Sequence, residues 1–147
     1  LLRQVYPVVQ TTPTVWREVQ GKIHSSPGRW QPPVARWLTG WLIVRRPRNR
    51  ELIRQLMANN PALDRGETEA IALALEVHAT TILVDERVGR KEVLTLGLNF
   101  TGTLGVLENA KAQGYIKAVR PILDAMRATN FHLGESLYQK FLRSIGE

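Results

Sequence analysis

Cysteine is absent from the 147 residues of this chain. Disulfide scaffolds, thiolate zinc sites and cysteine nucleophiles are therefore excluded. Long apolar runs are also missing, because residues 41–44 and 82–84 are far shorter than the roughly 18 residues that a membrane span needs. No charged leader with an apolar core opens the sequence, so we expect a cytoplasmic protein without a membrane segment. The length and a hydrophobic share of 44% predict a single domain with a real core.

Acidic residues are scarce in the first third of the chain. Residues 1–54 hold ten Lys and Arg but only two acids, Glu18 and Glu51, whereas the remainder holds ten against eleven. The net charge of +7 therefore arises in this region. Its densest basic group is Arg45, Arg46, Arg48 and Arg50. Because clustered arginines attract phosphate, we interpret this run as a nucleic-acid-binding segment. A solvated surface is the simpler alternative for any one of these charges.

Short apolar segments alternate with segments of helical periodicity. The predicted strands are residues 6–10, 41–44, 80–84 and 98–101, of which 41–44 is expected to be buried. The predicted helices are residues 13–22, 34–39, 49–60, 66–78, 87–96, 103–113, 117–128 and 134–145. This alternation predicts an α/β fold with a parallel sheet covered on both sides, ending in a helical tail. In such folds the functional site lies beyond the carboxyl ends of the strands.

Three carboxylates stand on three separate predicted elements. Asp85 directly follows strand 80–84, where this rule expects an active group, although it could equally be the N-cap of the next helix. Glu67 lies on the apolar side of helix 66–78, where a carboxylate is costly unless it is paired, capped or bound to metal. The spacing of Asp64 and Glu67 is also that of a capping box. Glu18 borders the apolar face of helix 13–22, and an ion pair is its simpler interpretation.

Taken together, these acids suit a site for a divalent cation. Oxygen-rich sites favour Mg²⁺ or Mn²⁺, which bind carboxylates, water and substrate phosphate. Such ions activate water and stabilise the leaving oxygen during phosphodiester cleavage. We therefore hypothesise that the side-chain oxygens of Glu18, Glu67 and Asp85 converge on one cation.

Two segments carry a resemblance to a known family. Residues 63–74 (LDRGETEAIALA) and 81–90 (TILVDERVGR) resemble the PIN-domain superfamily, and more narrowly its bacterial and archaeal members related to VapC-type toxins. Residues 12–19, 101–116 and 119–124 also match the pattern of that subgroup. The resemblance implies a three-layer α/β/α sandwich and metal-dependent endoribonuclease activity. It also implies the toxin role in a type II toxin–antitoxin pair.

The resemblance assigns roles to individual residues. Glu18, Glu67 and Asp85 match the second, third and fourth acidic positions of the family, so they are the expected catalytic residues and ligands of Mg²⁺ or Mn²⁺. Secondary candidates are Glu69, Glu86, Arg87 and Arg90, of which the two arginines would neutralise phosphate or the site itself.

The family pattern also contains a strand that this sequence lacks. An apolar strand ending in aspartate is expected upstream of Leu1, so we predict an N-terminally incomplete PIN-like domain over residues 1–147. The alternative is a catalytically inactive module that binds nucleic acid or a protein partner. The expected partners are an RNA substrate, an antitoxin protein and a second copy of the chain, with the helical tail from Lys117 as the docking element.

Overall fold

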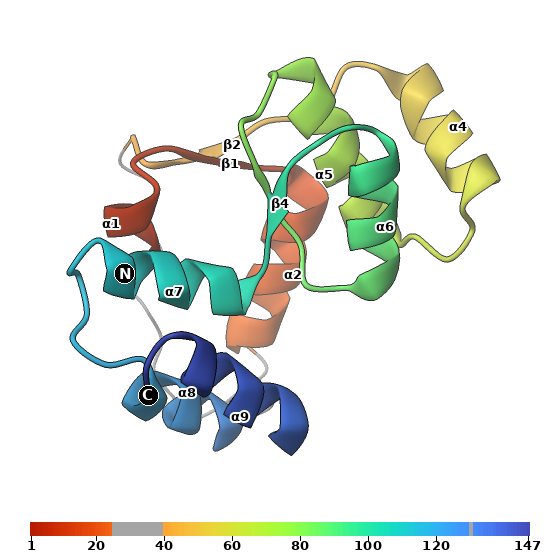
Figure 1. The fold of residues 1–147 in the computed structure, drawn as a ribbon. Coiled ribbons are helices and arrows are strands. Elements are labelled where there is room, and N and C mark those ends of the chain that lie inside the picture. Colours follow the sequence, from red (N-terminus) through yellow and green to blue (C-terminus); the bar gives the residue numbers. More distant parts are fainter. Residues whose placement is uncertain (25–39, 130) are drawn as a thin grey trace. The chain divides into compact units, whose positions relative to one another are not determined.

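The computed structural model describes residues 1–24, 40–129 and 131–147, and Figure 1 follows them along the chain. These residues form two compact units. The larger unit spans residues 6–101, and the smaller unit combines residues 1–5 with residues 102–147. Within the described ranges, no helix is long and apolar enough to cross a membrane.

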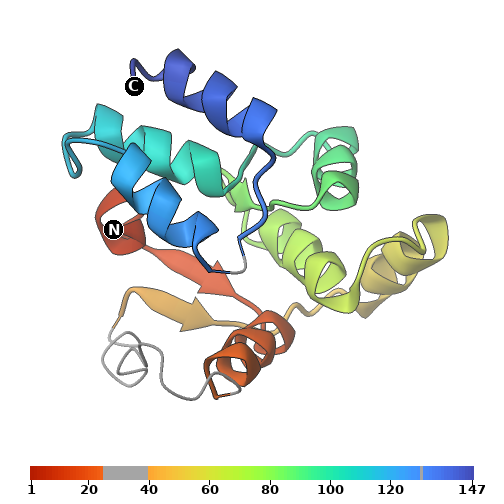
Figure 2. The same ribbon diagram turned by 90° about the horizontal axis from the view of Figure 1, so that it is seen from below.

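Four short strands in the larger unit pair in parallel. β1 (Val9–Thr11) pairs with β2 (Leu42–Val44), and β3 (Ile82–Leu83) pairs with β4 (Phe100–Thr101). Figure 2 shows the arrows of β1 and β2 side by side. The parallel pairing and the surrounding helices confirm the predicted α/β class. The single sheet that we expected is instead two pairs of strands in the described part of the chain.

The strand predicted at residues 41–44 is present, but it is not buried as expected. Ile43 and Val44 are both exposed by more than a third, whereas Trp41 is the buried residue. The Trp41 indole N–H donates a hydrogen bond of 2.7 Å to the carbonyl oxygen of Tyr6. The apolar run therefore contributes to the core through the indole that precedes β2.

The helices of the larger unit begin within one residue of the predicted starts. They are α2 (Pro13–His24), α4 (Arg50–Asn59), α5 (Arg65–Glu76) and α6 (Arg87–Thr95). The Thr12 hydroxyl accepts the Val15 N–H at 3.3 Å, and the Asn49 side chain accepts the Leu52 N–H at 2.9 Å, so both are N-caps. α5 ends at Glu76, two residues before the predicted end, because His78 adopts a left-handed φ of 49°. The helix predicted at residues 34–39 lies outside the described residues.

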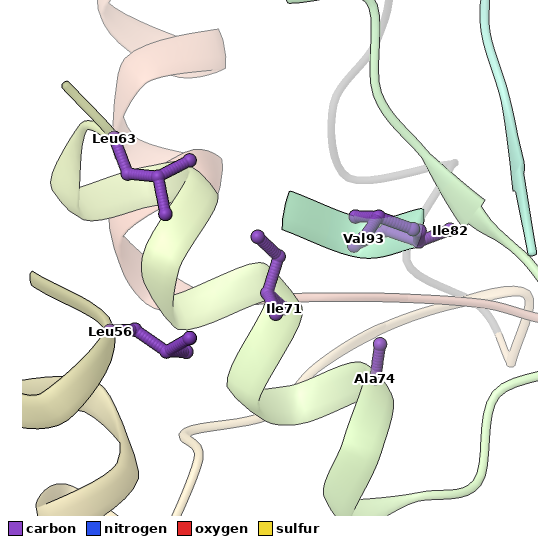
Figure 3. Packing of buried hydrophobic residues seen from close by; sticks show 6 residues of the cluster. All are labelled: Leu56, Leu63, Ile71, Ala74, Ile82 and Val93. Carbon is purple, nitrogen blue, oxygen red and sulfur yellow. The ribbon is translucent and has the colours of Figure 1, made fainter. Parts of the chain in front are cut away.

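One face of α5 carries the core of the larger unit. Ile71 and Ala74 point from α5 towards side chains from neighbouring elements, as Figure 3 shows. The full cluster is Leu56, Leu63, Ile71, Ala74, Ile82 and Val93. Because this packing fixes α5 against α4, α6 and β3, it also fixes the first turn of α5, which carries Glu67.

The smaller unit is helical and has its own core. Its elements are α1 (Leu2–Val5), α7 (Thr103–Ala112), α8 (Arg120–Arg127) and α9 (Glu135–Ser144). The buried residues that form its core cluster are Leu107, Val119, Leu123, Tyr138, Phe141 and Leu142. Of these helices, α8 and α9 confirm the predicted helical tail.

A carboxylate clasp links three parts of the smaller unit. Glu147 Oε1 accepts hydrogen bonds from Lys111 Nζ at 2.8 Å and from the Val119 N–H at 2.7 Å. Glu147 Oε2 accepts the Arg120 N–H at 2.8 Å. The hydrogen bond from Lys111, followed by those from the two backbone N–H groups, lowers the pKa of Glu147 to about 2.

Candidate active site

The first turn of α5 is closed by a reciprocal capping box. Asp64 Oδ1 accepts the Glu67 N–H at 2.6 Å, and the Asp64 N–H donates to Glu67 Oε2 at 3.4 Å. This confirms the capping interpretation of the Asp64–Glu67 spacing. The other carboxylate oxygen, Glu67 Oε1, is buried and has no hydrogen-bond partner among the described residues. One oxygen of Glu67 therefore serves the helix, and the other is left available.

The surroundings of Glu67 disfavour its charged form. Burial raises the pKa of Glu67, and the hydrogen bond from the Asp64 N–H only partly opposes this effect. The negative charges of Asp64 and Glu86 raise the pKa of Glu67 further. Because neighbouring carboxylates repel one another, a cation placed here would stabilise all three.

Glu18 reaches the same turn from α2. A Cβ built on the buried Gly66 would lie 3.1 Å from Glu18 Oε1 and 3.3 Å from Asp64 Oδ1. The missing side chain at Gly66 therefore lets two carboxylates approach the backbone at the start of α5. Glu18 itself is exposed.

The start of α6 borders Glu67 on another side. A Cβ built on Gly89 would lie 2.6 Å from Glu67 Oε1 and 2.7 Å from Val84 Cγ2. Val84 directly precedes Asp85, and Glu86 is near enough for its negative charge to raise the pKa of Glu67. These acids do not form a closed metal cluster, because no group of three His, Asp or Glu residues in the described ranges could hold a metal ion.

Asp85 is exposed and paired with a cation from α6. Its Oδ1 accepts a hydrogen bond of 3.0 Å from the Arg90 guanidinium, which also donates from Nε to the Val84 carbonyl oxygen at 3.0 Å. The N-cap residue of α6 is Glu86. The alternative that Asp85 is the N-cap of this helix is therefore wrong by one residue. Arg90 thus neutralises Asp85 in this structure, whereas Glu86 and Arg87 are exposed.

Glu69 belongs to a different environment from Glu67. It is buried, and its Oε1 accepts a 2.9 Å hydrogen bond from Arg65. Burial would raise the pKa of Glu69, but hydrogen bonds from Thr14 and Arg65, with the charges of Arg65 and Arg17, lower it overall. Glu69 therefore ties α5 to α2 as a paired charge.

The arginine run follows β2 and ends at Arg50, the first residue of α4. Arg45, Arg46, Arg48 and Arg50 are all exposed, and none of their guanidinium groups pairs with a carboxylate in the described part of the chain. The Arg48 backbone N–H donates to Glu76 Oε2 at 2.7 Å, which tethers the run to the end of α5.

The donor set around Glu67 fits a magnesium-type ion better than a metal that needs a full cage of protein ligands. Mg²⁺ usually takes one or two protein carboxylates and completes its shell with water and substrate phosphate. The buried, unpartnered Glu67 Oε1 supplies such an anchor. The joint ligation by Glu18, Glu67 and Asp85 stays a prediction, since Asp85 turns to Arg90 here.

Three residues at this site were not predicted as functional from the sequence. Asp64 was interpreted as a cap and was not among the predicted ligands, and no role was assigned to Gly66 or Gly89. The sequence signal that could have identified the two glycines is their position: Gly66 directly precedes Glu67, and Gly89 follows Asp85 by four residues. Glycine in a helix is costly, so its presence there indicates a close approach by another group.

Comparison with known proteins gives one match. A family model described as DUF3368, PIN domain, matches residues 1–147, which is the whole chain. No curated protein matches the chain, and no solved structure does.

Proposed function

Because the chain belongs to the PIN-domain family DUF3368 and therefore has a nuclease-type function, we propose that it is a metal-dependent endoribonuclease. The observation that carries this proposal is the buried Glu67 Oε1, which has no protein donor in the described ranges. Membership of the family and an available carboxylate oxygen together support hydrolysis of RNA phosphodiester bonds.

Glu67 would hold Mg²⁺ or Mn²⁺ through Oε1, with Glu18 and Asp85 as the further carboxylates. When bound, the ion supplies activation of water and charge stabilisation at the leaving oxygen. Arg90 orients Asp85 through the 3.0 Å hydrogen bond. The exposed arginines between β2 and α4 would attract the phosphate backbone of the substrate.

The toxin role is the finer part of the proposal. The resemblance of residues 63–74 and 81–90 to VapC-related proteins supports a cytoplasmic toxin that pairs with an antitoxin and forms a homodimer. Expression of the chain in a bacterial host should then arrest growth, and Asp85→Asn should relieve the arrest. Equal growth arrest by both proteins would contradict the toxin mechanism.

Glu67→Gln is the sharpest test of the nuclease. Glutamine keeps a side-chain oxygen for the capping box, so the start of α5 should be preserved while the charge is lost. We expect Mn²⁺-dependent RNA cleavage to fall by at least about 100-fold, the upper end of the loss seen for outer-shell partners of metals. Glu51→Gln is the matched control, because Glu51 is exposed on α4, where it pairs with Arg54 and accepts a hydrogen bond from Gln55. Unchanged cleavage by Glu67→Gln would overturn the assignment.

A second candidate is an inactive module that binds nucleic acid. Two observations favour it: Asp85 is paired with Arg90, and the described ranges contain no three-acid metal group. This module would bind RNA with a steep salt dependence yet cleave nothing with any divalent ion. Replacing Arg45 and Arg46 with glutamine should lower the salt slope by about 0.7 for each phosphate of a single strand that the variant no longer neutralises.

A further inference from the structure

The backbone of Gly89 lies against the available oxygen of Glu67. Gly89 is buried in the first turn of α6, where a Cβ would lie 2.6 Å from Glu67 Oε1 and 3.2 Å from Glu67 Cδ. Real Cβ atoms essentially never come within 3.0 Å of a non-bonded heavy atom from elsewhere in the chain. The Glu67 carboxylate can therefore occupy its position only while residue 89 has no side chain.

The backbone of α6 is held in place beside Glu67. Arg90 follows Gly89 directly, and its guanidinium bonds both the Val84 carbonyl oxygen and Asp85 Oδ1 at 3.0 Å. The Arg90 backbone N–H also donates to the Glu86 carbonyl oxygen at 3.0 Å. Because these bonds fix the first turn of α6 to the end of β3, a larger residue at position 89 would displace the flexible Glu67 side chain.

We propose that Gly89 is a positioning residue for the Glu67 carboxylate: the absence of a side chain at position 89 creates the place that Glu67 Oε1 occupies. Its catalytic meaning rests on the function proposed above, in which that oxygen binds the metal. Gly89 itself touches neither metal nor substrate.

Stability and position should respond differently when Gly89 is replaced. Alanine is a better helix former than glycine, so Gly89→Ala gains backbone stability in α6. The close approach to Val84 Cγ2, at 2.7 Å, offsets that gain. We therefore expect a cooperative unfolding transition near that of the wild type, together with a displaced Glu67 carboxylate.

Mn²⁺ binding, measured by titration calorimetry without RNA, tests the positioning role. Gly89→Ala should weaken Mn²⁺ affinity by about 10- to 100-fold, the range for residues that orient metal ligands. Gly21→Ala is the matched control, because Gly21 also lies in a helix and a Cβ there meets nothing within 4 Å. Its Mn²⁺ affinity should equal that of the wild type. Wild-type affinity in Gly89→Ala would overturn the proposal.

A metal-free measurement separates this proposal from the nuclease hypothesis. The shift in unfolding midpoint caused by Gly89→Ala is measured in the wild-type background and in the Glu67→Ala background. The contact between the new Cβ and Val84 is the same in both backgrounds, so it cancels in the comparison. Removing the Glu67 side chain relieves the clash, so the substitution should be more favourable in the Glu67→Ala background. Equal shifts would overturn the proposal, even if the wild type binds no Mn²⁺ and the nuclease hypothesis itself fails. If Gly89→Ala alone does not fold, recovery of folding in the double variant supports the proposal, and no recovery overturns it.

Discussion

Glu67 in the larger unit and Glu147 in the smaller unit are both partly buried glutamates, yet their surroundings differ in kind. The side chain of Glu147 accepts three hydrogen bonds, from Lys111 Nζ and from the backbone N–H groups of Val119 and Arg120. Glu67 receives one long bond on Oε2, none of the described residues donates to Oε1, and two further acids stand nearby. The pKa is accordingly lowered for Glu147 and raised for Glu67.

This difference distinguishes a carboxylate that stabilises a fold from one that is available for a ligand. The protein satisfies Glu147 completely, and its charge contributes to stability. The protein leaves the charge of Glu67 uncompensated, which lowers stability and is the usual condition of groups at functional sites. The same change of glutamate to glutamine should therefore have opposite effects at the two positions.

The largest loss of stability is expected for Glu147→Gln. The pKa of Glu147 is about 2 in the folded protein and 4.5 ordinarily. Its stabilising contribution is therefore fully present above about pH 4.5 and is lost as the pH falls towards 2. Glu147→Gln should destabilise the protein at neutral pH and flatten this acid-induced loss, as measured by chemical unfolding at several pH values. The exposed Glu108 on α7 supplies the control, and an equally steep acid loss in Glu147→Gln would contradict the clasp.

An intermediate effect is expected for Glu69→Gln. The substitution weakens the hydrogen bond from Arg65 within α5 and the hydrogen bond from Thr14 on α2, which should cost about 1–3 kcal/mol of unfolding free energy. Mn²⁺ affinity should change little, because Glu69 is already paired. A large loss of Mn²⁺ affinity without destabilisation would show that Glu69 belongs to the metal site and is not a structural ion-pair partner.

The smallest effect, with the opposite sign, is expected for Glu67→Gln without metal. The raised pKa means that the stabilising protonated state of Glu67 is lost as the pH rises, so its charge lowers stability at neutral pH. Removing that charge should raise the unfolding free energy by up to about 1 kcal/mol, because solvent partly screens the charge of a partly buried group. Destabilisation by this substitution at neutral pH would remove the contrast with Glu147.

Local features of this fold could be predicted from the sequence. Features that depend on contacts between residues far apart in the sequence could not. The Thr12 and Asn49 caps and the Asp64–Glu67 box follow from short-range spacing, which is why the starts of α2, α4 and α5 were predicted well. Glu67 Oε2 accepts the Asp64 N–H, whereas Oε1 lies unpaired against Gly89, and this arrangement depends on where α6 places Gly89. The Glu147 clasp joins residues 36 positions apart.

The candidate site was predicted in part for the same reason. Periodicity and strand ends place Glu67 and Asp85 on neighbouring elements, but they contain no information on which acid is neutralised. Arg90 neutralises Asp85 from the neighbouring helix α6, which neither signal shows. The Arg65–Glu69 pair, four residues apart on α5, is the one that helical spacing alone would have indicated. The exposure of β2 could not be predicted from the sequence either, because an apolar run indicates a strand without showing which residues cover it.

The stabilisation of the protein by Mn²⁺ tests the central claim, that Glu67 is held available for a cation, most directly. A ligand that binds only the folded state stabilises it by about 2.7 kcal/mol at 100 times its dissociation constant. We predict this increase in unfolding free energy for the wild type and for Glu51→Gln, and its loss in Glu67→Gln. An equal increase in Glu67→Gln, or none in the wild type, would contradict the account.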